Sequence, residues 1–377
     1  MQQSISPFPS SPEASWYSLT SDTELKVQRW MVSTEESRRI CNEPLFLGVD
    51  FSRGLQAAIT KAMKVAPFIN DLRKLDPCKL CTVNFLRGSL NFGLREALRD
   101  AAGSNTHATC FMSSQRFRVD GRWHVKEDMY RKLDIPQGAY LVLGDVVATG
   151  VTVDNGLQVM YDVMQEKGIK PAGLVFFTIG CHKIEKILER WHALFSKDNP
   201  GYKGTHVVYL EGKFRLVDSK TPLQIALQGT DLVKLGAILT PEYALSLYDN
   251  PAYVLERCAI YDAGSRAFDV PAYLEDVQGY WVQVAAIAKR GFTLKEALKE
   301  RWSEEGFETW ESFQALADLF WKGVSEEVRR QIYTAYQARW NAQFLTESES
   351  PKALLNIANA RLHAIQHNCP FHCTEAP

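Results

Sequence analysis

One stretch constrains the fold more than any other part of the 377-residue chain: Ala139 to Thr152, AYLVLGDVVATGVT. It begins with an apolar run typical of a buried strand and continues through Gly144 and Asp145 into a loop of small residues. A helix is predicted directly after the loop, because apolar residues recur at helical spacing between Leu157 and Met164. A strand, a tight loop and a helix in this order predict an α/β unit.

The loop between this strand and this helix has the composition of an anion-binding site. Backbone N–H groups in the first turn of a helix have no intrahelical partner, and the positive end of the helix favours a phosphate there. Gly150 permits close approach of the backbone, and Thr149 and Thr152 supply hydroxyl donors. The pattern therefore predicts phosphate binding. An ordinary strand, turn and helix without a ligand remains the alternative.

These residues resemble the signature of the type I phosphoribosyltransferases: a hydrophobic strand, two acidic residues, two apolar residues, and then a small residue, Thr, Gly, any residue and Thr. The resemblance implies that Asp145 holds the ribose hydroxyls of phosphoribosyl pyrophosphate (PRPP) and is the candidate catalytic residue. Gly144 stands where the family has its first acidic residue, which leaves a slow enzyme, a modified donor or a shifted carboxylate open. The resemblance also implies that five loop residues bind the 5-phosphate: Ala148, Thr149, Gly150, Val151 and Thr152.

A second loop of the same plan lies upstream. A predicted strand, Thr82 to Leu86, leads into Arg87, Gly88 and Ser89, and a helix is predicted from about Phe92 to Ala102. The tripeptide resembles the family's pyrophosphate loop, and Arg87 would add a charge-assisted contact to phosphate. Loops that follow parallel strands lie at the same edge of the sheet, so we expect both anion-binding loops to form one site.

A basic segment follows the next predicted strand, which spans residues 108 to 112. The resemblance implies that the segment from Gln115 to Arg131 is a mobile loop that closes over PRPP and excludes water. Arg116 and Lys126 are the candidate pyrophosphate contacts in this loop. A solvated hairpin is the alternative structure.

Strand and helix patterns alternate between Thr82 and Val217, which predicts an α/β fold with a mainly parallel, doubly wound sheet of the type I phosphoribosyltransferase kind. Helical patterns dominate after Pro222. We therefore expect three parts: a loose N-terminal lead-in over residues 1–20, a phosphoribosyltransferase-like domain with an N-terminal helical segment over 21–222, and an all-helical C-terminal domain over 223–377.

Composition limits the partners of the chain. A formal net charge of −1 gives no electrostatic reason to expect nucleic acid or a membrane surface as a partner. Neither a signal peptide nor an apolar run long enough to span a membrane is evident, so we expect a cytoplasmic protein. The eight cysteines are spread along the chain and are expected to be free thiols or ligands.

Cysteine and histidine also gather near the C-terminus, where five such residues fall within eleven positions: His363, His367, Cys369, His372 and Cys373. The spacing of the first two places both imidazoles on one helix face, and zinc is one ligand that such a cluster could bind. Cys78 and Cys81 form half of a zinc site by themselves. A frayed C-terminus is the alternative.

The resemblance implies an enzyme that transfers a 5-phosphoribosyl group from PRPP to a small, nucleobase-like acceptor, with Mg²⁺ as cofactor and pyrophosphate as the leaving group. Its partners would be PRPP and that acceptor, and a homodimer is left open. Two other functions also remain open: a non-catalytic PRPP or nucleotide sensor, and an enzyme that runs the reaction in reverse. The identity of the acceptor does not follow from the fold.

Overall fold

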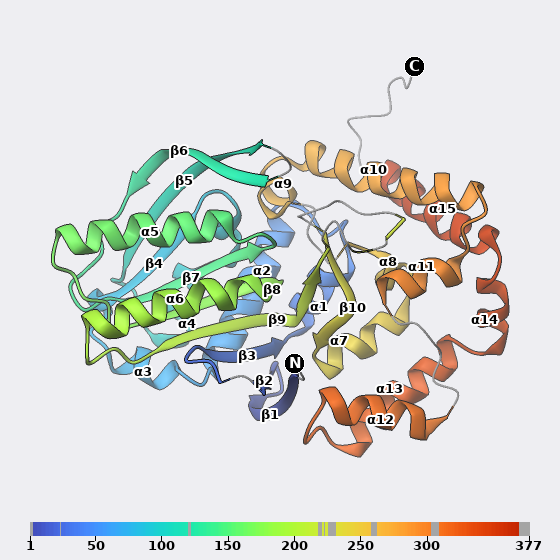
Figure 1. Ribbon diagram of the computed structural model, residues 1–377, viewed down its shortest axis with the longest axis horizontal. Helices are drawn as coiled ribbons and strands as arrows, with labels where there is room; N and C mark the ends of the chain where they lie inside the picture. Colours follow the sequence, from blue (N-terminus) through green and yellow to red (C-terminus); the bar gives the residue numbers. More distant parts are fainter. Residues whose placement is uncertain are drawn as a thin grey trace.

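The computed structural model describes residues 3–22, 24–119, 122–217, 221, 223–224, 231–257, 262–302 and 309–368 (Figure 1). From 114 to 129 it describes only the backbone. The strands are β1 (Gln3–Ser11), β2 (Ala14–Ser21), β3 (Gln28–Ser33), β4 (Leu80–Phe85), β5 (Ala108–Val119), β6 (Arg122–Lys132), β7 (Tyr140–Val147), β8 (Gly173–Cys181), β9 (Thr205–Leu216) and β10 (Leu232–Leu239).

These described strands form one ten-stranded mixed sheet. Their order is β1-β2-β3-β9-β8-β7-β4-β5-β6, and β10 pairs with β9 outside this path. The pairs from β3 through β9, β8, β7 and β4 to β5 are all parallel, whereas the pairs at both ends of the sheet and the β9–β10 pair are antiparallel. The expected mainly parallel sheet is therefore confirmed for its centre.

Helices cover both faces of the sheet. Alternate residues of β7 enter opposite cores: Leu141 and Leu143 pack with apolar residues of α5 and α6, whereas Tyr140 and Val142 pack with residues of α2 and α4. Figure 1 shows α5 and α6 in front of the sheet. The helices before residue 222 are α1 (Glu35–Asn42), α2 (Gly48–Lys64), α3 (Ile69–Lys74), α4 (Leu94–Ala102), α5 (Val151–Glu166) and α6 (Lys183–Asp198), with 3-10 helices η1 (Pro77–Lys79) and η2 (Gly88–Phe92).

The expected loose lead-in over residues 1–20 is corrected by the structure. Strands β1 and β2 form an antiparallel hairpin that β2 joins to β3. Pro7 and Pro9 suggested a break, but β1 lies at the edge of the sheet, where a missing N–H costs no ladder bond. Trp16 of β2 is fully buried, and its indole N–H donates to the Ala62 carbonyl at 3.2 Å, which ties the hairpin to α2.

The described elements after residue 222 are helices, as expected, except for β10. That strand is a correction, because it extends the sheet into the segment predicted to be all helical. Gly236 has a φ of +70° within a bulge of β10, and this irregularity hid the strand pattern. No helix of the described residues is long and apolar enough to cross a membrane. The helices here are α7 (Pro241–Ser246), η3 (Leu247–Asp249), α8 (Pro251–Leu255), α9 (Ala263–Phe268), α10 (Val270–Lys289), α11 (Leu294–Arg301), α12 (Trp310–Phe320), α13 (Glu326–Arg339), α14 (Ala342–Ser348) and α15 (Pro351–Asn368).

Candidate functional site

The two predicted anion-binding loops meet at one edge of the sheet. Strands β4 and β7 are parallel neighbours, with Leu80 opposite Tyr140 and Val83 opposite Leu143. The loops that leave their carboxyl ends therefore lie side by side. The fully buried Ser89 hydroxyl donates to the Gly144 carbonyl at 2.5 Å, and this bond joins the Arg87–Ser89 loop to strand β7. Gly144 and Asp145 still belong to this strand, which continues to Val147.

Gly88 and Asp145 are in close contact across this junction. A Cβ added to Gly88 would lie 3.1 Å from Oδ1 of Asp145, so a side chain at position 88 would crowd the carboxylate. The same oxygen accepts the backbone N–H of Val146 at 2.9 Å, which fixes one side of the carboxylate. Arg87 is exposed, and the peptide bond between Leu86 and Arg87 is cis. The backbone before Ser89 thus passes directly beside the predicted ribose-binding residue.

The absence of a side chain at position 144 is explained by packing against Phe92, a residue outside the motif. A Cβ at this position would lie 2.7 Å from Cδ1 and 2.8 Å from Cγ of Phe92, which is fully buried at the end of η2. Real Cβ atoms do not approach carbon so closely. Phe92 therefore occupies the space that the family's first acidic side chain would need, and the departure from the motif follows from packing.

The phosphate-type loop has the geometry that its sequence predicts. Gly150 adopts a φ of +79°, and an added Cβ would lie 2.5 Å from Cδ1 of Ile187 in α6. Helix α5 begins at Val151, and no side chain caps its N-terminus. Thr149 in the loop is partly exposed. Oγ1 of Thr152 is buried and has no hydrogen-bond partner in the described part of the chain. The first turn of α5 therefore retains donors for a bound anion.

Two side chains near this loop favour its structure and its charge, those of Cys181 and Arg190. The Cys181 thiol, at the end of β8, donates to the Ala148 carbonyl at 3.1 Å. Burial raises the pKa of this thiol, which keeps it protonated and able to donate. Asp154 in the first turn of α5 would repel an anion, but it is ion-paired with Arg190. The pair lowers the electrostatic cost of placing a phosphate near this turn.

A helix from the C-terminal region reaches the Arg87–Ser89 loop. The side-chain amide of Asn91 donates to the carbonyls of Gly88, at 3.2 Å, and Ala263, at 2.9 Å. Gly264 of α9 approaches so closely that its Cβ would lie 3.7 Å from the Gly88 nitrogen. Figure 1 shows α9 beside this end of the sheet. The region after residue 222 thus contributes directly to one wall of the site.

The described backbone of the basic segment is that of a hairpin, and its closure over PRPP stays a prediction. Strands β5 and β6 pair in antiparallel fashion from Phe111 and Lys132 to Val119 and Arg122. The open alternative, a hairpin, is therefore the observed structure. The candidate contacts Arg116 and Lys126 lie in this hairpin, but their side chains fall outside the described part, so their roles remain predictions.

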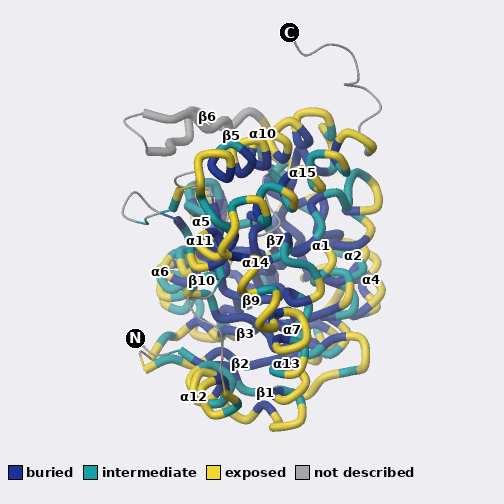
Figure 2. Tube along the Cα trace, turned by 90° about the vertical axis from the view of Figure 1, so that its right-hand side faces the viewer, coloured by how far each residue is buried: buried dark blue, intermediate teal, exposed yellow. Residues whose placement is uncertain are grey.

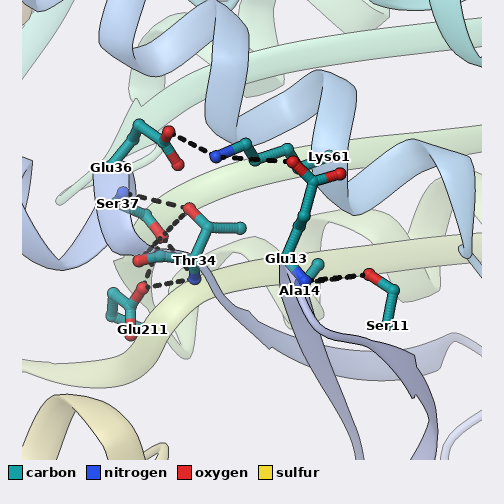
Figure 3. Close-up of polar contacts among 8 residues, drawn as sticks. All are labelled: Ser11, Glu13, Ala14, Thr34, Glu36, Ser37, Lys61 and Glu211. Atoms are coloured by element: carbon teal, nitrogen blue, oxygen red, sulfur yellow. Dashed lines mark hydrogen bonds and ion pairs between the residues drawn. The ribbon is translucent and has the colours of Figure 1, made fainter.

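A buried glutamate, Glu211, lies on β9, two strands from β7 in the sheet. Glu211 has a φ of +63°, unusual for a residue with a side chain, and its carboxylate accepts the Thr34 N–H at 3.1 Å and the Thr240 hydroxyl at 3.0 Å. The Ser37 hydroxyl also donates to it (Figure 3). Burial raises the pKa of Glu211 to about 7. The group therefore titrates near neutral pH, where it ties β9 to α1 and α7.

The predicted zinc ligands do not gather among the described residues. No group of three or more His, Cys, Asp or Glu side chains in this part of the chain could hold a metal ion. Cys78 is exposed, whereas Cys81 is buried with its sulfur 3.6 Å from that of Cys110. The imidazoles of His363 and His367 contact each other through Nε2 atoms at 2.9 Å. The remaining predicted ligands lie outside the described residues: Cys369, His372 and Cys373.

Sequence reasoning located both loops but missed the residues that hold them. Cys181 lies at the end of the apolar run that forms β8, and this position at the carboxyl end of a parallel strand is the signal that could have revealed it. In the sequence, Asn91 and Phe92 look like ordinary residues at the start of a helix. Nothing in the sequence of α9 links this helix to the Arg87–Ser89 loop, because Gly88 and Ala263 are 175 residues apart.

No protein-family model and no curated protein matches this chain. Three solved structures are similar to parts of it. The AQ2163 protein from Aquifex aeolicus is 14% identical over 48% of this chain and 85% of that chain, with a TM-score of 0.32. A hypoxanthine-guanine phosphoribosyltransferase from Bacillus anthracis is 18% identical over 34% and 67%, with a TM-score of 0.23. The L. donovani hypoxanthine-guanine phosphoribosyltransferase is 20% identical over 36% and 75%, with a TM-score of 0.25. TM-scores this low do not establish a shared activity.

Proposed function

We propose that this protein is a phosphoribosyltransferase that uses PRPP and Mg²⁺ to transfer a 5-phosphoribosyl group to a nucleobase-like acceptor. The observation that carries this proposal is the Ser89–Gly144 hydrogen bond, which ties the Arg87–Ser89 loop to β7, the strand that leads into the 148–152 loop. PRPP carries a phosphate and a pyrophosphate on one sugar, so its binding requires two such loops side by side. Asp145 lies between them, where the ribose of PRPP would sit.

Each loop has a separate role in this proposal. Residues 148–152 would bind the 5-phosphate through backbone N–H groups and the Thr152 hydroxyl, whose oxygen has no partner in the described structure. The Arg87–Ser89 loop would bind the pyrophosphate, with Arg87 as the charge-assisted donor. Asp145 would accept the ribose hydroxyls and so orient C1 toward the acceptor. Contacts at three points of one substrate use binding free energy to fix the orientation of that substrate.

The residues present fit magnesium as an ion carried by the substrate. Mg²⁺ usually binds through one or two carboxylates together with phosphate oxygens and water. Asp145 is a carboxylate beside Gly88, three residues before the 148–152 loop, and the described chain offers no closed cage of ligands. When bound, the ion would neutralise charge on the departing pyrophosphate.

The reaction would be a substitution at C1 of the ribose. The bond from C1 to the pyrophosphate oxygen breaks, a nitrogen of the acceptor forms the new bond to C1, and pyrophosphate leaves with the bonding electrons. The protein contributes position and charge rather than a covalent intermediate. Helix α9 lies against Gly88, and we assign the acceptor side of the site to this helix and the β5–β6 hairpin.

A second candidate is a non-catalytic PRPP or nucleotide sensor. The contact between Gly144 and Phe92 favours it, because the chain has no space for a second acidic residue beside Asp145. A ribose held by one carboxylate is less strictly oriented. A sensor would bind PRPP through the same loops without turnover.

Calorimetric titration of PRPP with Mg²⁺ tests the proposal on the full chain. Thr152→Val removes the buried hydroxyl at nearly constant volume, and Thr346→Val alters an exposed threonine on α14 as the matched control. We expect magnesium-dependent binding to the wild type, at least tenfold weaker binding to Thr152→Val, and unchanged binding to Thr346→Val. Absence of binding to the wild type would refute both the transferase and the PRPP sensor.

Comparison of ligands distinguishes the two candidates. A transferase should also bind Mg²⁺-pyrophosphate, and it should release pyrophosphate from PRPP when supplied with the correct acceptor from a nucleobase panel. A sensor that reads only the 5-phosphate would bind ribose 5-phosphate as tightly as PRPP and would release no pyrophosphate with any acceptor.

A further inference from the structure

An apolar pocket lies far from the two loops, between β10 and the C-terminal helices. Its volume is about 180 Å³. One wall is the bulge of β10, where the register against β9 jumps from Val233 opposite Arg215 to Ile238 opposite Lys213. Four residues of β10 thus face a single residue of β9, and they leave the regular ladder. The bulge separates this part of the strand from α12 and so opens the pocket.

Aromatic rings form most of the opposite wall. Five of the lining residues are aromatic: Tyr248, Trp302, Phe313, Phe320 and Trp321. Trp302, Phe320 and Trp321 remain partly exposed, so the pocket keeps large apolar groups in contact with water. Figure 2 shows that α12 lies at the surface with many exposed residues. A ligand that covered these rings would remove apolar surface from water.

Two polar side chains of this lining are already engaged, those of Trp321 and Lys234. The indole N–H of Trp321 donates to the Leu239 carbonyl at 2.9 Å. The Lys234 side chain is almost fully buried, and its ammonium donates to the Glu256 carbonyl at 2.8 Å. Lys234 is the one ionisable group among the described lining residues apart from the Tyr248 phenol. The pocket therefore presents no charge that would favour an ionic ligand.

We infer that this pocket is a second small-molecule site and that it takes a neutral, flat aromatic ligand of one or two rings. The size supports this ligand class, because a buried apolar cavity of about 150 Å³ is large enough to bind benzene. Flat rings also match the walls, since aromatic groups pack edge to face or offset-stacked against one another.

The pocket is separate from the proposed PRPP site. Strand β10 lies three positions from β7 in the sheet, through β9 and β8. At about 4.8 Å per strand, this separation is roughly 14 Å before any side chains are counted. A ligand here would not contact the Asp145 loop, and the inference does not depend on the proposed transferase activity.

Fluorine NMR with 5-fluoroindole as the probe tests this inference on the full chain. Leu316 lines the pocket and is 40% exposed, so Leu316→Trp should fill its mouth. Leu319 lies on the same helix, is 45% exposed and is not among the lining residues, which makes Leu319→Trp a matched control. Ala317→Leu fills the pocket from inside and serves as a second variant. Thermal midpoints identify any variant that does not fold.

We expect saturable line broadening of the probe with the wild type and with Leu319→Trp, and at least tenfold weaker binding to Leu316→Trp and Ala317→Leu. A benzylammonium probe with a fluorinated ring should bind at least tenfold more weakly than 5-fluoroindole, because the described lining residues include the Lys234 ammonium and no carboxylate. Absence of saturation with the wild type, equal binding by folded Leu316→Trp and Leu319→Trp, or equal affinity for the cationic probe would each overturn the inference. Mg²⁺-PRPP binding by Leu316→Trp should equal that of the wild type.

Discussion

Replacement of Gly144 tests whether packing explains why this chain lacks the first acidic residue of the motif. Gly144→Asp places an acidic residue at the first acidic position of the motif. In this structure, however, the new Cβ would lie 2.7 Å from the buried Phe92 ring, so the ring or the strand must move. We therefore expect Gly144→Asp to destabilise the fold instead of improving the site.

The magnitude follows from the two costs that the substitution combines. Forcing extra atoms into a packed core typically costs about 1–3 kcal/mol, and this alone applies to Gly144→Ala. An aspartate adds a buried polar group without a partner, at about 1–3 kcal/mol more. We expect unfolding free energies lowered by about 2 kcal/mol for Gly144→Ala and by about 4 kcal/mol for Gly144→Asp.

Urea unfolding followed by tryptophan fluorescence measures these changes. Gly279→Ala is the control, because this glycine is an exposed residue of α10 and an added Cβ would meet nothing within 4 Å. There the better helix propensity of alanine should raise stability by about 0.5–1 kcal/mol. Opposite signs for the two Gly→Ala substitutions would support the packing argument.

A double-mutant cycle with Phe92→Ala identifies the clashing partner. Loss of this ring should itself cost about 3–5 kcal/mol, but in its absence Gly144→Ala should cost less than about 0.5 kcal/mol. The reasoning is refuted if the two substitutions add, or if Gly144→Ala leaves the wild-type protein as stable as before.

Three further predictions concern the two loops and the buried glutamate. Asp145→Asn should reduce pyrophosphate release at least a hundredfold while the binding of inorganic phosphate changes less than threefold, and equal losses in both assays would contradict the separate roles of the carboxylate and the phosphate loop. Ser89→Ala should weaken Mg²⁺-PRPP binding about five- to tenfold in calorimetry by breaking the bond to Gly144, whereas Thr82→Val, at the other end of β4, should not. Burial raises the pKa of Glu211 from its ordinary 4.5 to about 7, so the folded state binds this proton more tightly and the wild type loses stability as the pH rises through that window. Glu211→Gln removes this loss, and urea unfolding should show the variant gaining about 3 kcal/mol relative to the wild type between pH 4.5 and 7; a difference independent of pH would show that Glu211 does not titrate there.

Local patterns determined much of the sheet and the position of both loops. The strand that begins at Tyr140, the turn at Gly150 and the following helix could be predicted, because each depends on residues adjacent in the chain, although the strand continues past Gly144 and Asp145 to Val147. The same holds for β4, the Arg87–Ser89 loop and α4. Prediction failed at residues 1–20 and at β10, where an edge position tolerated prolines and a bulge interrupted the alternation.

The sequence by itself thus determined the turn at Gly150 and the helix that follows it, and phosphate binding at this turn stays a prediction. Only the tertiary structure decided how those segments are held. Three contacts hold them: the Ser89–Gly144 bond, the packing of Phe92 against Gly144, and the approach of α9 to Gly88. The residues in each contact are distant in the chain or oriented by their neighbours. Such contacts depend on how strands and helices pack in three dimensions, and no periodicity in one dimension encodes them.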